Sequence, residues 1–468
     1  MENIDYVPDW AKNAIIYHIY PLGFFDAPKY RDQENQVVNR LENIRNYYNH
    51  FQKLGMTVIQ FGPLFESTSH GYDTIDFFKI DRRLGTNDLF RDIVSELHEL
   101  EIRIILDGVF NHVGREFFTF QDIQQNGASS NYLNWHFVDF KNNSPKNDGF
   151  DYKNWEGHYS LVKLNLSDKT VKDYVYQAVQ YWLKDIGIDG WRLDVAYLIP
   201  QNFWKEFRER CLNIKPECFL VGELIHGPYN KWVNRELLHA GTEYQVYKSI
   251  YSAFNDRNIY ELKAVLENSY HPQWGQIKDQ VMMIFLGNHD TTRIRSILHK
   301  EQHLKLAFFL LFTLRGIPKI YYGDELGMTG VKTEKSDYEV RRAMISPEHE
   351  LTNIEIFQMI MNLIKIRKSN HALIYGNLNC FYADSHKGQT MAFLRQSSKQ
   401  TLLVIINADF QKKKVNVPLW NLNLVEDQVF VDIMQKCDLN EYRVKKNHLL
   451  IEIDSCWGRI LEMKYSHP

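Results

Sequence analysis

Eight short runs rich in β-branched and aromatic residues alternate with longer segments of helical periodicity over roughly the first 375 residues. Runs of this length are typical of strands, and a helix after most of them is typical of parallel strands joined by helical crossovers. We therefore expect an α/β fold, and a (β/α)₈ TIM barrel in preference to an open doubly wound sheet. The expected strands begin at Ala14, Thr57, Arg103, Asp189, Phe219, Thr242, Val281 and Ile317.

Two of the intervening segments carry signals for a helix N-terminus. The segment "NDLFRDIVSELHEL" follows Thr86, and "DKTVKDYVYQAVQYWLKDI" follows Ser167 and opens on Asp168. Side-chain oxygens at such positions accept hydrogen bonds from the free N–H groups of the first helical turn. Both segments are amphipathic, so we expect helices that pack on the outside of the barrel.

One connection is much longer than the others. After the third expected strand, roughly fifty residues rich in Asn, Asp, Gly and aromatic side chains precede the next clear helix. A loop of that length is usually functional or a small subdomain. From about Gly376, strand-like runs follow one another without helices, which predicts a C-terminal antiparallel β-sandwich. The expected domains are the barrel (1–112 and 165–375), the inserted subdomain (113–164) and the β-sandwich (376–468).

Charge, cysteine content and hydropathy predict a soluble cytoplasmic protein. The net charge over 468 residues is −3 and there is no excess of basic residues, so neither a nucleic-acid nor a membrane partner is expected. The five cysteines are odd in number and form no CxxC pair, which favours reduced thiols. The N-terminus "MENIDYVPDWAKN" lacks the apolar core of a signal peptide, and no apolar run reaches transmembrane length.

Acidic residues stand at the carboxyl ends of four expected strands, where barrel enzymes gather their chemistry. Arg192 and Asp194 are two residues apart, so in a strand their side chains project from the same face. Crowded carboxylates raise the pKa of one another. A carboxyl pair with different proton affinities is what a glycosidase uses, and a separation of about 5 Å leads to retention, a wider one to inversion. The four acids are Asp107, Asp194, Glu223 and Asp290, and their basic or imidazole neighbours are His112, Arg192 and His289.

The blocks around these residues resemble glycoside hydrolase family 13, the α-amylase family, over nearly the whole chain. In the order of that family they are "DGVFNH", "GWRLDVA", "GEL" and "LGNHD". The resemblance implies a retaining mechanism in which Asp194 is the nucleophile, Glu223 is the general acid and base, and Asp290 stabilises the transition state. It further implies that Arg192 keeps Asp194 ionised while Glu223 holds its proton.

Other blocks imply contacts with the sugar at the cleavage point, subsite −1. "SHGYDTIDF" resembles the block whose tyrosine stacks under that sugar, which gives Tyr72. "DYEVRRAM" resembles the block whose Asp and Arg reach it, which gives Asp337 and Arg341, with Arg342 as the alternative. The substrate-binding residues that the resemblance implies are Tyr72, His112, Arg192, His289, Asp337 and Arg341.

The sequence of one block indicates the subgroup of the family and whether its calcium site is present. "LVKLN" resembles "MPKLN" of neopullulanases, cyclomaltodextrinases and maltogenic amylases, although a first strand near Ala14 leaves no room for the N-terminal domain usual in that group. In secreted α-amylases an aspartate that helps to bind calcium stands where this chain has Lys163. An ammonium cannot ligate a hard cation. We therefore expect no required cofactor and no metal ligands, although Asn111 matches another calcium ligand of the family.

The resulting prediction is a cytoplasmic hydrolase of α-1,4-glucosidic bonds in maltooligosaccharides and other α-glucans, acting as a monomer or homodimer. A transglycosylase or isomerase stays open, as does cyclomaltodextrinase or neopullulanase specificity, because these enzymes share the catalytic residues. From other classes, a catalytically silent interaction protein is disfavoured because all three catalytic carboxylates are present. A metal-dependent hydrolase that uses His112 and His289 as ligands is a remote alternative, which activity insensitive to chelators would exclude.

Overall fold

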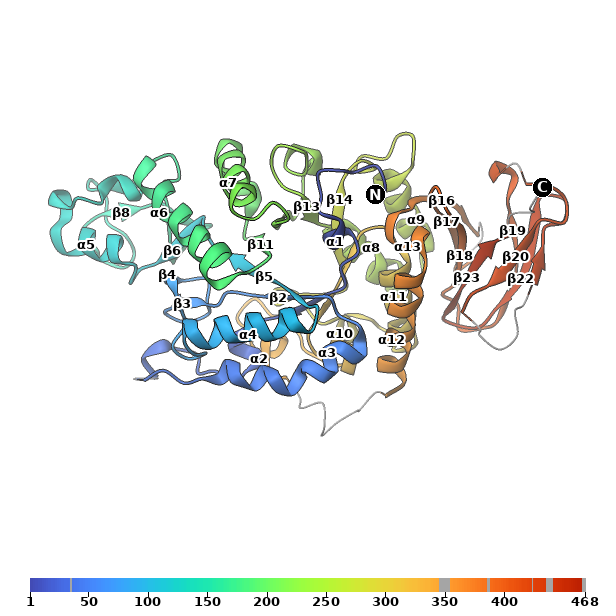
Figure 1. Cartoon of the computed structure of the whole chain (residues 1–468), viewed down its shortest axis with the longest axis horizontal. Helices are drawn as coiled ribbons and strands as arrows, with labels where there is room; N and C mark the ends of the chain where they lie inside the picture. The colour runs from blue at the N-terminus through green and yellow to red at the C-terminus, as the bar shows by residue number, and fades with distance from the viewer. Residues whose placement is uncertain (34–35, 345–353, 385–387, 423, 435–440, 465–468) are drawn as a thin grey trace.

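The chain consists of a central barrel with a small inserted subdomain at one end and a β-sheet domain at the other (Figure 1). We obtained this architecture from a computed structural model. The residues that the structure describes are 1–33, 36–344, 354–384, 388–422, 424–434 and 441–464.

Eight parallel strands close into the barrel, and their order around it follows the chain. Each strand pairs with the next, and β1 pairs with both β2 and β15. The predicted (β/α)₈ barrel is thus confirmed. The strands are β1 (Ile16–Ile19), β2 (Val58–Phe61), β5 (Arg103–Gly108), β11 (Gly190–Leu193), β12 (Phe219–Gly222), β13 (Ala240–Thr242), β14 (Val281–Phe285) and β15 (Ile317–Tyr321).

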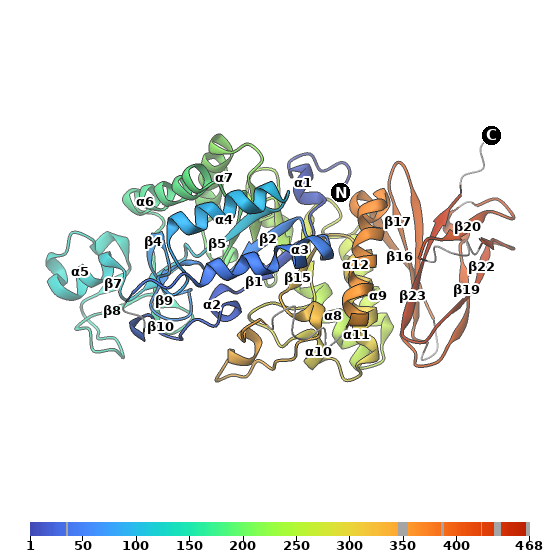
Figure 2. The ribbon, with the colours of Figure 1, turned by 60° about the horizontal axis from the view of Figure 1, so that its bottom comes forward.

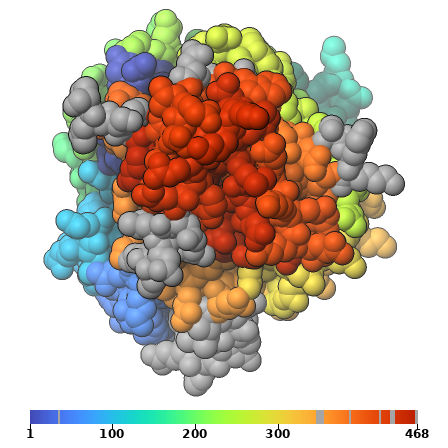
Figure 3. Space-filling model, turned by 90° about the vertical axis from the view of Figure 1, so that its right-hand side faces the viewer, coloured from blue at the N-terminus to red at the C-terminus, as the bar shows by residue number. Residues whose placement is uncertain are grey.

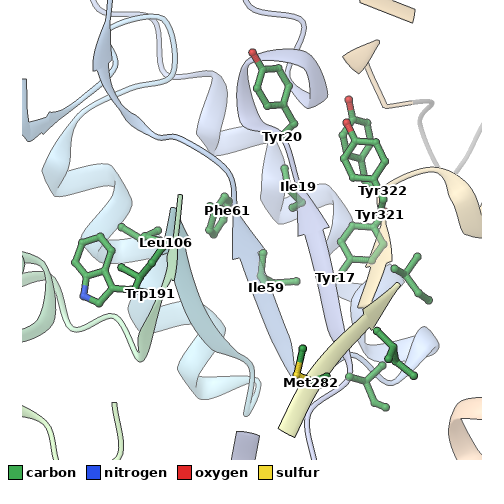
Figure 4. Close-up of a cluster of buried hydrophobic side chains, with 14 of the residues drawn as sticks. Tyr17, Ile19, Tyr20, Ile59, Phe61, Leu106, Trp191, Met282, Tyr321 and Tyr322 are labelled. Carbon is green, nitrogen blue, oxygen red and sulfur yellow. The ribbon is translucent and has the colours of Figure 1, made fainter. Parts of the chain in front are cut away.

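Side chains alternate along these strands between two apolar layers, as the period of a strand requires. One layer faces the surrounding helices and includes Ile59, Phe61 and Trp191 (Figure 4). The other fills the barrel itself and packs against the N-terminal residues around Ala11. We call this inner layer the barrel plug. It consists of Ile16, Val58, Ile105, Phe219, Val221, Ala240, Val281, Met283 and Ile317.

The two predicted helix starts are confirmed. Helix α4 (Asn87–Glu99) has Thr86 as its N-cap, which accepts a hydrogen bond from Leu89 N–H. Helix α6 (Lys169–Gln180) has Asp168, which accepts from Thr170 and Val171, and it continues as a π-helical turn to Ile186. The other helices are α1 (Asp9–Lys12), α2 (Pro21–Phe24), α3 (Tyr48–Leu54), α7 (Gln201–Ile214), α8 (Tyr244–Asn255), α9 (Ile259–Tyr270), α10 (Ile294–Ile297), α11 (Gln302–Thr313), α12 (Ile354–Ser369) and α13 (His371–Tyr375).

The predicted place of the sixth strand, "TEYQVY" from Thr242, is wrong. Strand β13 ends at Thr242, and helix α8 begins two residues later. The carboxylate of Glu243 caps this helix by accepting a hydrogen bond from Val246 N–H. The alternation of Thr, Tyr and Val is typical of a strand, but the cap and the packing of α8 override that local preference.

The long connection after β5 has secondary structure of its own, so it is a subdomain and not an open loop. Helix α5 (Phe118–Asn126) lies in it, at the end of the molecule away from the C-terminus (Figures 1 and 2). We propose residues 113–164 as its extent. Its strands are β6 (His112–Gly114), β7 (Val138–Asp139), β8 (Asp151–Tyr152), β9 (Asn154–Trp155) and β10 (His158–Lys163). Outside the subdomain, β3 (Phe65–Ser67) and β4 (Thr74–Ile80) form a hairpin after β2.

The C-terminal residues form antiparallel sheets, as predicted, and dominate the view from that end of the molecule (Figure 3). A six-stranded sheet and a two-stranded sheet share one apolar core. Helices α9 and α11 contact the larger sheet and join it to the barrel. We propose Gly376 as the start of this domain. Its strands are β16 (Asn377–Ala383), β17 (Thr390–Gln396), β18 (Thr401–Asn407), β19 (Lys413–Pro418), β20 (Val429–Asp432), β21 (Glu441–Arg443), β22 (His448–Ile453) and β23 (Trp457–Met463).

Four cysteines lie in the described part of the chain, and each is a free thiol: Cys211, Cys218, Cys380 and Cys456. The fifth, Cys437, lies outside the described residues. Within the described residues, no helix combines the length and the apolar character that a membrane crossing requires.

The barrel plug should carry a large share of the stability of the fold. Met283 is fully buried in it, so Met283→Ala should lower the free energy of unfolding by about 2–5 kcal/mol, since lost transfer energy and the remaining cavity both contribute. Leu450→Ala serves as the control because Leu450 is 52% exposed, and its effect should stay within about 0.5 kcal/mol. Urea unfolding measures both; equal effects would contradict the assignment of Met283 to a packed plug.

Candidate active site

Three of the four predicted carboxylates come from neighbouring strands of the barrel. Asp107 lies in β5, Asp194 directly follows β11, and Glu223 directly follows β12. Because these strands are parallel and adjacent in the order β5, β11 and β12, their carboxyl ends meet at one edge. All three side chains are buried there.

The guanidinium of Arg192 joins these three carboxylates. Its Nη1 donates to both carboxylate oxygens of Asp107, at 2.7 and 2.9 Å, and to Oδ1 of Asp194 at 2.8 Å. Its Nη2 lies 2.8 Å from Oε1 of Glu223. Arg192 faces Asp107 in the register of β5 and β11, and it shares a strand face with Asp194. A buried cation and buried anions therefore satisfy each other.

The backbone after Asp194 is strained. Val195 has φ 40° and ψ 44°, in the left-handed region that is unfavourable for a β-branched residue. Its N–H donates to Oε2 of Glu223 at 3.0 Å. Strain of this kind persists where surrounding contacts fix it, and it is common at functional sites. Here it ties the turn after Asp194 to the carboxylate of Glu223.

The fourth carboxylate, Asp290, belongs to a second set of ion pairs beside the first. His289 Nε2 lies 2.8 Å from Oδ2 of Asp290, and Arg341 Nη2 donates to Oδ1 at 2.8 Å. Arg341 also pairs with Asp337 at 2.7 Å. The hydroxyl of Tyr72 connects the two sets, since it donates to Oδ2 of Asp107 at 3.1 Å and contacts Nε2 of His289.

The structure places Arg341, and not Arg342, against Asp290. The guanidinium of Arg342 is directed away from it, to the backbone carbonyls of Glu339 and Thr329. Among the predicted binding residues, Tyr72, His289, Asp337 and Arg341 are thus linked by direct contacts. His112 lies nearby, with its ring 6.0 Å from that of Trp155 and its Nε2 buried without a hydrogen-bond partner in the described part of the chain.

Sequence reasoning missed several residues of this site. Tyr20, which follows β1, stacks on His289 with ring centroids 5.8 Å apart, and the guanidinium of Arg341 lies 4.8 Å from the centre of its ring. Tyr244 contacts Oε1 of Glu223 at 3.4 Å. The position of Tyr20 at a strand end was a usable signal, whereas Tyr244 lies in the segment that was wrongly predicted as a strand.

A cavity of about 630 Å³ opens beside the second set of ion pairs. Tyr20, His70, Asp337 and Arg341 are among the residues that line it, and Tyr30 and Tyr338 are large exposed aromatic residues along it. Flat rings beside charged and hydroxyl groups suit a ligand that has both apolar C–H faces and many hydroxyls.

The predicted contact between Arg192 and Asp194 is present, but burial of the Asp194 carboxyl opposes its ionisation. Burial raises the pKa of Asp194 well above its usual value, and the charges of Glu223 and Asp107 act in the same direction, while Arg192 opposes them. Three carboxylates share one guanidinium here, so a proton retained by the cluster belongs to the group and not to one residue.

Asp290 behaves in the opposite way. Burial alone would raise the pKa of this carboxyl, but His289 and Arg341 hold it well below its usual range. Asp290 is therefore ionised throughout the neutral range. The difference arises because Asp290 pairs with both His289 and Arg341, and shares Arg341 only with Asp337, whereas three carboxylates share Arg192.

The residues at the position of the family's calcium site do not fit the ion. Lys163 is half-buried, and burial together with the nearby Lys153 lowers its pKa. The carbonyl of Asn111 accepts from Leu164 N–H at 3.0 Å, and its amide contacts Nδ1 of His112. In the part of the chain that the structure describes, no three His, Cys, Asp or Glu side chains are grouped to hold a metal.

The chain is similar to known proteins over most of its length. A family model described as the α-amylase catalytic domain matches residues 19–353. A cyclomaltodextrinase from Thermoanaerobacter pseudethanolicus is 32% identical over 426 residues, which cover 87% of this chain and 72% of that protein. Neopullulanase 2 from Thermoactinomyces vulgaris is 32% identical over 430 residues, covering 87% and 71%. The solved structure of a cyclic α-maltosyl-(1→6)-maltose hydrolase from Arthrobacter globiformis has a TM-score of 0.80 and 28% identity, covering 98% of this chain and 100% of that one.

Removal of divalent cations should leave this protein intact. Because Lys163 takes the place of a calcium ligand, excess EDTA should not change the melting temperature. Differential scanning fluorimetry with EDTA, and then with added calcium, measures this. A fall in melting temperature that calcium reverses would contradict the inference that Lys163 replaces a calcium ligand.

Proposed function

The chain belongs to the α-amylase family, as its motif blocks predicted, and from that premise we propose that it is a retaining glycoside hydrolase of α-1,4-glucosidic bonds in maltooligosaccharides. One observation carries the proposal: Arg192 binds Asp107, Asp194 and Glu223 at once, so two carboxyl groups from neighbouring strands lie side by side at the barrel mouth. A close pair of carboxyl groups is what double displacement requires.

In the first step of the proposed reaction, Glu223 gives its proton to the glycosidic oxygen. The carboxylate of Asp194 forms a bond to C1 as the bond from C1 to that oxygen breaks, and the shortened glucan leaves with the proton. In the second step Glu223 takes a proton from water, the water oxygen bonds to C1, and the bond to Asp194 breaks. Each step inverts C1, so the two together retain its configuration.

The proposed reaction needs one proton in the cluster, located on Glu223 once substrate is bound. The hydrogen bond from Val195 N–H and the contact with Tyr244 fix the direction of the Glu223 carboxyl. Asp290, ionised by its partners His289 and Arg341, supplies a negative charge that stabilises the positive charge developing on the sugar ring.

The proposed substrate is an α-glucan, with the sugars on the non-reducing side in the cavity lined by Tyr20, Asp337 and Arg341. In this arrangement Tyr72 stacks under the sugar at the cleavage point, and His112 and His289 bind its hydroxyls. The free Nε2 of His112 is a buried donor or acceptor that such a hydroxyl would satisfy. The names of the relatives, cyclomaltodextrinase and neopullulanase, support a maltodextrin substrate.

Two alternatives rest on the same catalytic residues. A transglycosylase would use a sugar hydroxyl where the hydrolase uses water, and cyclic substrates are suggested by the name of the Arthrobacter enzyme, whose full length this chain covers. A timed product profile separates them: products longer than maltotriose, appearing early from maltotriose, favour transfer. Digestion of β-cyclodextrin tests activity on cyclic substrates, and digestion of pullulan tests activity on a chain that contains α-1,6 bonds. We place the enzyme in the cytoplasm, as a monomer or homodimer, and its free thiols support a reducing compartment.

Loss of either proposed catalytic carboxyl should abolish turnover. Asp194→Asn removes the nucleophile and Glu223→Gln removes the acid and base, so each should lower kcat by about 10⁴-fold or more. The control is Asp185→Asn, since Asp185 is exposed on the surface after α6. Reducing-sugar release from maltoheptaose measures all three. Substantial activity in either catalytic variant, with the control unchanged, would refute the assignment.

A further inference from the structure

Lys319 lies inside the barrel, in the middle of the otherwise apolar strand β15. Ile317, two residues earlier on the same face, belongs to the barrel plug, so Lys319 projects into the barrel directly above the plug. The residue is only 3% exposed. Its ammonium lies 4.7 Å from the ring centre of Phe285, and within the described residues it has no hydrogen bond or salt bridge.

The charged groups that influence Lys319 electrostatically come from the strands around it. Three of them are carboxylates, and the other cation among them is Arg192, which already serves the three carboxylates described above. His18 adds no charge, because burial lowers its pKa well below the usual value, with Lys319, His289 and Arg192 acting in the same direction. By element, these groups are His18 from β1, Asp107 from β5, Arg192 from β11, Glu223 after β12 and Asp290 after β14.

A role in packing alone does not account for Lys319. A methionine or leucine would fill an inward position above the plug without desolvating a charge, whereas burial disfavours the charged form of Lys319. Buried ionisable groups with perturbed pKa values are concentrated at functional sites, where their charge acts on neighbouring groups. The site above Lys319 is the carboxylate cluster.

We propose that Lys319 is a positioning residue whose positive charge, placed beneath the carboxylates, limits how many protons the Asp107–Asp194–Glu223 cluster retains. The inference rests on the proposed function, because an ionised Asp194 is required only if this carboxylate attacks C1. Lys319 itself contacts no reacting atom in this role. It acts through the cluster, and it leaves Arg192 to fix the geometry.

The effect of Lys319 has a definite sign and pH range. Burial lowers the pKa of Lys319 to about 7, with Arg192 acting in the same direction and Glu223, Asp107 and Asp290 opposing. The ammonium is therefore charged below pH 7 and loses its charge as the pH rises through 7. Without this charge the carboxylates of the cluster hold protons more tightly. This effect has the same direction as burial, which raises the pKa of Asp194. The acid limb of the activity profile should then move to higher pH.

The test compares the pH dependence of kcat/KM on maltoheptaose for the wild type, Lys319→Met and Lys319→Gln. On the acid limb, the ratio of wild type to either variant should increase about tenfold for each pH unit by which the limb moves. Above pH 7 the ratio should level off, because Lys319 is neutral there in the wild type as well. Lys53→Met, which makes the same exchange at an exposed position on α3, serves as the control.

Circular dichroism confirms that each variant is folded, and the glutamine variant carries the test if the methionine variant is not. Profiles that stay parallel to that of the wild type at every pH would overturn the inference. A purely structural role would lower kcat/KM by the same factor at every pH and would not shift the acid limb of the profile. If the wild type is active on maltoheptaose in that experiment, the proposed function still holds. A folded wild type without activity on any α-glucan would instead overturn the proposed function and this inference with it.

Discussion

The guanidinium of Arg192 is the interaction on which the site depends. It binds three buried carboxylates from three neighbouring strands, and ionised carboxylates buried without such a partner would strongly destabilise the fold. The parallel register of β5 and β11 sets Arg192 opposite Asp107, and the period of the strand sets it beside Asp194. The geometry of the site is therefore a direct consequence of strand pairing.

The interior of the barrel changes character along its axis. Its amino-terminal half is the apolar barrel plug, which holds the strands in place, and its carboxyl-terminal half contains ionised side chains. Lys319 stands at the boundary, with Ile317 on one side and the carboxylates on the other. Burial removes the screening of water, so each charge strongly affects the proton affinity of its neighbours. A small number of charged residues can therefore control the chemistry at the mouth of the barrel.

The fold and the carboxylate cluster could be predicted from the sequence because they depend on local patterns. Apolar runs mark the strands, and acids such as Glu223 stand where those runs end. The sixth strand could not be placed, since Glu243 caps a helix through a contact that strand propensity does not encode. The raised pKa of Asp194 depends on how many carboxylates share Arg192, and Tyr20 and Lys319 enter the site through the closure of the barrel. Such features are properties of the folded arrangement.

In the proposed mechanism Asp194 and Glu223, held by one guanidinium, perform two successive displacements at C1. The most direct measurement is proton NMR of the sugar released early from maltoheptaose, before mutarotation equilibrates the anomers. The account predicts that the α-anomer appears first, because two inversions restore the configuration. A β-anomer at the earliest times would mean a single displacement by water, and would contradict the account.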